Sequence, residues 1–148
     1  MHIGPLFWDA RLSDQSISVE ETIAAAEAIL PGRPAPDDEA DPRWKAVIAV
    51  AEFIPSDPQA VWSFILRWGV SLDGDLRAAI ACCALEHLLQ QHFDAFYDRV
   101  VEAASRDALF ADTVSRCWVF APGIEPERAA KFDALRKSLR RKTREQNR

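Results

Sequence analysis

The sequence is poor in the features that mark membrane, sheet and disulfide-rich proteins. No apolar run among its 148 residues is long enough to cross a bilayer, and its start lacks the basic and long apolar regions of a secretory signal. Only five glycines are present, and β-branched residues are sparse beside alanine and leucine, which favours helix over sheet. Its three cysteines lie in apolar, helix-like contexts, which suits reduced thiols in a cytoplasmic protein better than a disulfide framework.

Motifs of common enzyme classes are also missing. There is no glycine-rich phosphate loop, and no serine or cysteine stands in a recognisable nucleophile turn. The formal net charge of −5 and the pI near 5.2 argue against nucleic acid as the default partner and leave room for a basic protein partner. We therefore expect a protein without a cofactor that is better suited to binding than to catalysis.

Basic residues are concentrated near the C-terminus. Half of the 18 lysines and arginines lie from Arg128 onward, which leaves the chain before that point clearly acidic. A basic tail of this kind can touch phosphates, but it lacks the interleaved aromatic residues of a base-stacking surface. Cations near the end of a last helix also complement the helix dipole, which is the simpler explanation.

The segment Asp73–His92 is the part around which the rest of the chain is expected to pack. After its opening turn residues it continues without proline or glycine through good helix formers. Two apolar stripes follow it at helical spacing: Leu76, Ile80, Cys83 and Ala84, then Leu85, Leu88 and Leu89. A helix that is apolar on two faces must be covered on two sides, so we place it in the middle of the molecule.

Regularly placed start signals predict the helices before this segment. Ser18 and Glu21 fit a capping box, and Asp41, Asp57 and Asp73 are cap residues about 16 positions apart. Two such intervals approach the period of HEAT-type helical repeats. The predicted apolar positions of the helix after Asp41 are Trp44, Val47, Ile48, Ala51 and Ile54.

The later part of the chain continues the helical pattern. An apolar stripe runs from Phe93 to Ala104, Asp107 restarts a helix, and a last helix begins at Glu125–Glu127. We predict an all-α fold of six to seven antiparallel helices, arranged as a HEAT-like layer or an irregular bundle. The whole chain, 1–148, is expected to form one domain, with an N-terminal arm at 1–16, a proline-rich loop at 31–40 and a frayed basic tail at 140–148.

One stretch, Trp44 to Trp118, resembles a family of small bacterial all-helical proteins of unknown function. The matching residues are Trp44, Leu85-Glu86-His87-Leu88-Leu89 with His92, Phe96, Asp98-Arg99-Val100, Ala103, Ala104, Phe110 and Cys117-Trp118. The chain departs from that pattern with Cys83-Ala84 where the family has Gly-Pro, and with Phe93 where it has Gly. A second likeness, of Asp75-Leu76-Arg77-Ala78-Ala79, is to the start of a HEAT repeat helix. Both resemblances imply a helical fold and no particular chemistry.

Cys83, Glu86 and His87 are the candidate metal ligands. Cys83 and His87 are four residues apart, so one helical face could present both to an ion. The same residues are also explained without a metal, as small core thiols and an ordinary surface carboxylate. A metal-dependent enzyme or metal sensor is therefore an alternative function.

Acidic and aromatic residues are the candidates for protein binding. Asp94, Asp98 and Glu102 could line one helix face, and Trp44 and Trp62 could anchor a partner unless they pack in the core. Our principal hypothesis is a non-catalytic protein–protein interaction module with an acidic, aromatic-anchored surface. A toxin-neutralising protein of the immunity type, binding a basic toxin, is a specific form of this hypothesis. The sequence does not indicate the oligomeric state.

Overall fold

The computed structural model describes residues 17–32, 41–117 and 125–146, and these residues form helices without any strand. The predicted all-α fold is confirmed. The elements are α2 (Val19–Ile29), α3 (Pro42–Ala51), α4 (Pro58–Trp68), α5 (Gly74–Ile80), the π-helical segment η1 (Ala81–Leu85), α6 (Glu86–Arg106), α7 (Ala108–Ser115) and α8 (Pro126–Gln146).

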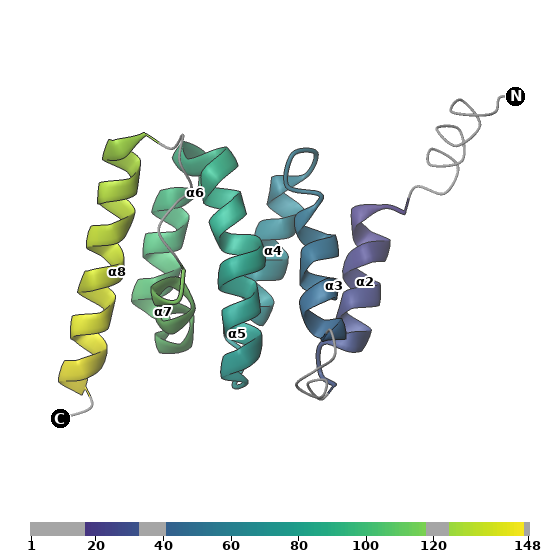
Figure 1. The fold of residues 1–148 in the computed structure, drawn as a ribbon, viewed down its shortest axis with the longest axis horizontal. Coiled ribbons are helices and arrows are strands. Elements are labelled where there is room, and N and C mark those ends of the chain that lie inside the picture. The colour runs from purple at the N-terminus through teal and green to yellow at the C-terminus, as the bar shows by residue number, and fades with distance from the viewer. Residues whose placement is uncertain (1–16, 33–40, 118–124, 147–148) are drawn as a thin grey trace, which may run out of the picture.

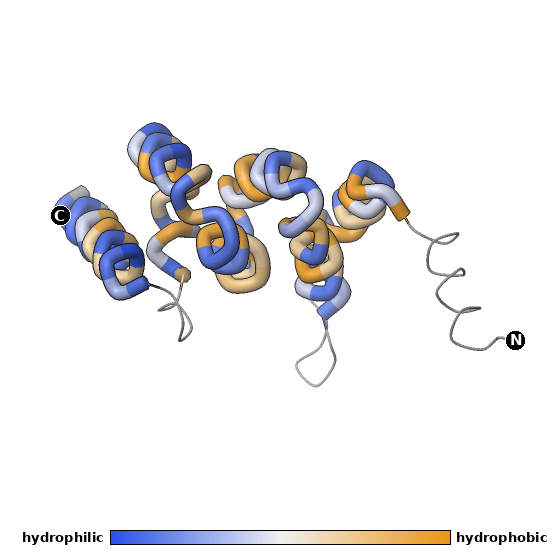
Figure 2. The backbone as a smooth tube through the Cα atoms, turned by 90° about the horizontal axis from the view of Figure 1, so that it is seen from above, coloured by the Kyte–Doolittle hydropathy of each residue, from blue (hydrophilic) through white to orange (hydrophobic). Residues whose placement is uncertain are grey.

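The helices stand side by side in an elongated row, with α2 at one end and α8 at the other (Figure 1). Seen from above, successive helices alternate between two staggered layers (Figure 2). Neighbours along the row pack on each other: α3 contacts α2 on one side and α5 with η1 on the other, while α7 packs between α6 and α8. Within residues 17–32, 41–117 and 125–146, the helices form a row and do not close into a bundle.

Aspartate and serine caps begin the helices where the sequence predicts. The Ser18 hydroxyl accepts a hydrogen bond from the Glu21 backbone N–H, and the Glu21 carboxylate accepts one from the Ser18 N–H, which completes the capping box. Asp41, Asp57 and Asp73 each accept a hydrogen bond from a backbone N–H in the first turn of their helix. These bonds satisfy donors that a helix start otherwise leaves unpaired.

Both apolar stripes of the central helix are buried, as predicted. Ile80, Leu85 and Leu88 are fully buried, and α5, η1 and α6 form one helical run. The run bends at His92, whose backbone is non-helical (φ −138°, ψ 45°) and whose Nε2 lies 3.2 Å from the carbonyl oxygen of Ile54. The bend separates the central helix from the aromatic stripe that follows it, so the described residues contain six helical runs, or seven straight ones.

One prediction about a helix face needs correction. The buried positions of α3 are Arg43, Ala46, Val47 and Val50, one step from the predicted stripe, and Ile48 is 47% exposed. The last helix continues to Gln146, so it includes residues 140–146 of the basic tail. The expected arm at 1–16 and most of the loop at 31–40 lie outside the described residues. None of the described helices is both long and apolar enough to span a membrane.

Candidate functional site

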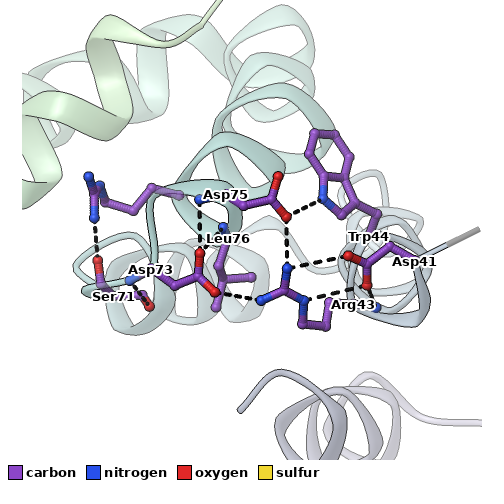
Figure 3. Close-up of polar contacts among 8 residues, drawn as sticks. Asp41, Arg43, Trp44, Ser71, Asp73, Asp75 and Leu76 are labelled. Atoms are coloured by element: carbon purple, nitrogen blue, oxygen red, sulfur yellow. Dashed lines mark hydrogen bonds and ion pairs between the residues drawn. The ribbon is translucent and has the colours of Figure 1, made fainter. Parts of the chain in front are cut away.

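A buried arginine decides how α3 is turned. Arg43, in the first turn of α3, is 1% exposed, and Figure 3 shows its guanidinium surrounded by carboxylates. It donates to Asp73 Oδ2 at 2.6 Å, to Asp75 Oδ2 at 2.7 Å and to both carboxylate oxygens of Asp41 at 3.3–3.4 Å. Trp44 Nε1 donates to the same Asp75 oxygen at 3.1 Å. The cluster ties the start of α3 to the start of α5.

The electrostatics of this cluster favour the charged forms. The hydrogen bond from Arg43 holds the pKa of Asp73 below its usual value, although partial burial opposes the shift. Burial works against the charge on Arg43, but hydrogen bonds to Asp41 and Asp73 outweigh it and raise the pKa of the guanidinium. A buried charge is tolerated only when it is paired in this way, so the rotation of α3 that brings Arg43 inward is strongly favoured.

This rotation turns an aliphatic ridge of α3 outward and leaves a groove between α2 and α3. The groove is about 610 Å³. One face of α2 and one face of α3, with the residues next to these helices, line the groove. The lining residues are Ile17, Glu21, Thr22, Ala25, Ala26, Ile29, Ala46, Ala49, Glu52 and Phe53. Ile17 is 57% exposed and Ile29 41% exposed, so the groove walls are apolar and open to solvent.

A second hollow, of about 370 Å³, lies on the other side of the same ridge. It is formed between α3, η1 and the start of α6 by Ile48, Ala51, Glu52, Cys82, Cys83, His87 and Gln91. Glu52 borders both hollows, so they adjoin at the end of α3. We call the two hollows and the Ile48 ridge between them the α2–α3 surface.

Burial raises the pKa of two of the three thiols. Burial, with the nearby Cys82 and Glu86 as smaller causes, raises the pKa of Cys83 to about 11. Burial also raises the pKa of Cys117 well above its ordinary value. Thiolate is the nucleophilic form, so these shifts favour the neutral thiol form of both groups.

The predicted metal ligands do not form a site. Cys83 and His87 both line the second hollow, as their spacing implies, but Glu86 is not among its lining residues. Within the described part of the chain, no three His, Cys, Asp or Glu side chains gather closely enough to hold a metal ion. The metal-dependent alternative therefore receives no support from the geometry.

The predicted acidic face is a mixed-charge surface. Asp94 pairs with Arg128 of α8 at 2.7 Å, and Glu102 pairs with Arg106 one turn further along α6 at 3.1 Å. Asp98 is exposed between them. Because two of the three carboxylates already have arginine partners, this face attracts a basic partner less than the sequence suggested.

The two predicted aromatic anchors have structural roles. Trp44 is half-buried and bonded to Asp75, as described above. Trp62 is only 5% exposed, and its ring contacts those of Phe96 and Phe110. Trp62 therefore packs in the core, and it also lines a hollow of about 410 Å³ between α4 and α6 that Glu102 borders.

Sequence reasoning missed the isoleucines of the α2–α3 surface and the buried Arg43. Ile48 was predicted to be buried because it fits a helical apolar stripe. The available signal was Arg43 itself, which lies two residues after a capping aspartate and shares a helix face with Val47 and Val50. A pattern of hydrophobic residues does not reveal that an arginine will be buried.

Comparison of the chain with protein-family models, curated proteins and solved structures finds no match. The resemblances to the bacterial helical family and to HEAT repeats therefore rest on the quoted residues alone.

Proposed function

We propose that this protein is a non-catalytic binding module whose α2–α3 surface takes an amphipathic helix of a partner protein, with an apolar face flanked by lysine or arginine. One observation carries the proposal. Of the five large hydrophobic side chains exposed in the described residues, Ile17, Ile29 and Ile48 all belong to this surface. Exposed apolar side chains gathered around a groove are typical of binding surfaces.

Charge favours a basic flank on the partner. Residues 1–92 contain fourteen acidic and six basic side chains, whereas residues 93–148 contain nine and twelve. Glu21 and Glu52 border the groove itself. Complementary charge speeds encounter and selects among partners, while apolar contact supplies most of the affinity.

The shape of the surface suits a helix better than a small ligand. Two adjoining hollows with a low ridge between them offer separate places for side chains spaced along one helix face. The exposed isoleucines come from different helices, with Ile29 on α2 at the first hollow and Ile48 on α3 at the second. We place this binding in the cytoplasm because the cysteines are suited to the reduced state. Neutralising a basic toxin would be a particular case of it.

The test measures binding of a defined probe to the full chain by fluorescence anisotropy. The probe is a labelled amphipathic helical peptide of leucine and lysine, compared with a leucine–glutamate peptide of the same pattern. We expect the lysine peptide alone to bind, and Ile29→Glu or Ile48→Glu to weaken it about tenfold or more, since each places a charge in an apolar contact. Leu72→Glu is the matched control, because Leu72 is 89% exposed and lies outside the surface.

Equal binding of both peptides, or equal weakening by Leu72→Glu, would contradict the proposal. A version of the chain without residues 1–16 tests a competing occupant, namely the chain's own apolar residues Leu6, Phe7 and Trp8. If only the shortened chain binds the lysine peptide, the surface accommodates its own N-terminal segment rather than a partner.

A further inference from the structure

Three arginines, from the end of α7 and from α8, line one pocket. A pocket of about 380 Å³ between α5, α7 and α8 is lined by Ala78, Arg116, Cys117, Arg136 and Arg140. We call it the arginine pocket. Like charges repel, so arginines that share a pocket need nearby anions.

The protein supplies only part of this compensation. Arg116 Nε donates to Asp112 at 2.7 Å, but the same Asp112 oxygen also accepts from Arg77 Nε at 3.0 Å. Partial burial raises the pKa of Asp112, but the hydrogen bonds from Arg116 and Arg77 outweigh this effect and hold the pKa below its ordinary value. One carboxylate therefore serves two guanidinium groups and cannot neutralise both.

The other two arginines are also incompletely paired. Arg136 Nη1 donates to Asp133 at 3.3 Å, and that carboxylate also pairs with Lys137 at 3.1 Å. Arg140 Nη2 donates to the backbone carbonyl of Ser115 at 2.9 Å, which brings no negative charge.

One donor at the pocket has no partner at all. Arg136 is 8% exposed, and its Nε is a buried nitrogen without a hydrogen-bond acceptor in the structure. Leaving a charged donor buried and unpaired is costly, and such groups are rare unless something binds them.

The charged side chains around the pocket do not balance one another. The basic groups are Arg77, Arg116, Arg136, Lys137 and Arg140, and the carboxylates paired with them are Asp112 and Asp133. Glu86 also acts on this region, because it raises the pKa of Cys117 while Arg136 lowers it. With Glu86 included, about two positive charges remain uncompensated.

We propose that the arginine pocket binds a phosphate group, as inorganic phosphate or as the monoester of a small molecule. A phosphate dianion would balance the two uncompensated positive charges, and its oxygens can accept hydrogen bonds from several guanidinium groups at once. Ala78 and Cys117 provide an apolar side against which the organic part of a monoester would lie. This site is separate from the α2–α3 surface and does not depend on the proposed function.

Isothermal titration calorimetry on the full chain at constant ionic strength tests this proposal. The titrants are inorganic phosphate and glycerol phosphate, with chloride as the reference anion. We expect both phosphates to bind and chloride to give no saturable heat, and a tighter monoester would identify the organic part as recognised. Arg136→Gln and Arg140→Gln should each weaken phosphate binding about tenfold or more, since each removes charge-assisted hydrogen bonds.

Arg141→Gln is the matched control, because it removes the same charge from the exposed neighbouring position on α8. It should change the affinity less than about twofold, as expected for a screened surface charge. If Arg136→Gln does not fold, Arg140→Gln decides, because its side chain is exposed. Absence of saturable phosphate binding, or equal weakening by the Arg140 and Arg141 variants, would overturn the proposal. Binding of a single-stranded oligonucleotide that both variants weaken equally would overturn it too, in favour of a diffuse basic surface.

Discussion

Two arginines are buried in the described residues, and their surroundings are opposite. Arg43 is 1% exposed in the acidic half of the chain, and each of its three guanidinium nitrogens donates to a carboxylate. Arg136 is 8% exposed in the basic half, with one carboxylate contact that it shares with Lys137 and one nitrogen without a partner. The first lies between α3 and α5, and the second lies on α8 at the far end of the row (Figure 1).

The difference shows that burial alone does not assign a role to a charged residue. Where several carboxylates surround one guanidinium, the protein itself balances the charge of the arginine, and the arginine fixes the rotation of its helix. Where several guanidinium groups converge on few carboxylates, the fold leaves charge for an external anion to balance. The following three experiments would break or sharpen this comparison, in order of expected effect.

Replacing Arg43 by Met should give the largest loss of stability. The change removes the cation that Asp41, Asp73 and Asp75 share and leaves their carboxylates close to one another. Breaking a fully buried pair costs about 3–5 kcal/mol of unfolding free energy, and the partial exposure of Asp73 and Asp75 places the expected loss at the lower end of that range. Urea unfolding followed by circular dichroism measures it. Arg67→Met is the control, because the exposed Arg67–Glu27 pair should contribute less than about 1 kcal/mol. Equal losses in the two variants would show that Arg43 does not hold α3 against α5.

Acid should weaken the Arg43 cluster specifically. The folded-state pKa of Asp73 is lowered by Arg43, so its stabilising effect is present above the ordinary carboxyl pKa and is lost as the pH falls through the lowered folded value. Asp73→Asn should cost about 1–2 kcal/mol at pH 7, after allowance for the partial exposure of this carboxylate. It should also reduce the difference between urea midpoints measured at pH 7 and pH 3. Asp94→Asn, at an exposed pair, should leave that difference unchanged.

Replacing Arg136 by Met should give the smallest effect on stability. An apolar side chain of similar length removes an unpaired buried donor and relieves repulsion among the arginines of the pocket, so we expect a change below about 1 kcal/mol, or a slight stabilisation. The measurement is the same urea series in phosphate-free buffer. A loss as large as that of Arg43→Met would mean that Arg136 is a structural residue, and the contrast between the two arginines would fail.

Local helix signals were predicted well because they depend on neighbouring residues alone. Ser18, Asp41, Asp57 and Asp73 cap their helices as expected, and the double stripe of the central helix is buried. These features follow from hydrogen bonds within one turn and from the helical spacing of apolar side chains.

The candidate sites were predicted less well because they depend on residues distant in sequence. Arg43 is buried through carboxylates about thirty positions later in the chain, and this turns Ile48 outward against its apolar pattern. Arg136 and Arg140 are interpreted from the sequence as part of a basic C-terminal segment. They share a pocket with Arg116 only because α8 packs on α7. The acidic residues of α6 similarly acquire partners that the sequence does not indicate, such as Arg128 for Asp94.

The sequence by itself determined that this protein is helical, where its helices begin, and that one end of the chain is acidic and the other basic, because caps, spacing and charge are properties of short segments. Only the tertiary structure decided which faces remain exposed and which charges stay unbalanced. Those outcomes depend on the distances between side chains from different helices, and Coulomb energy and desolvation both vary steeply with such distances.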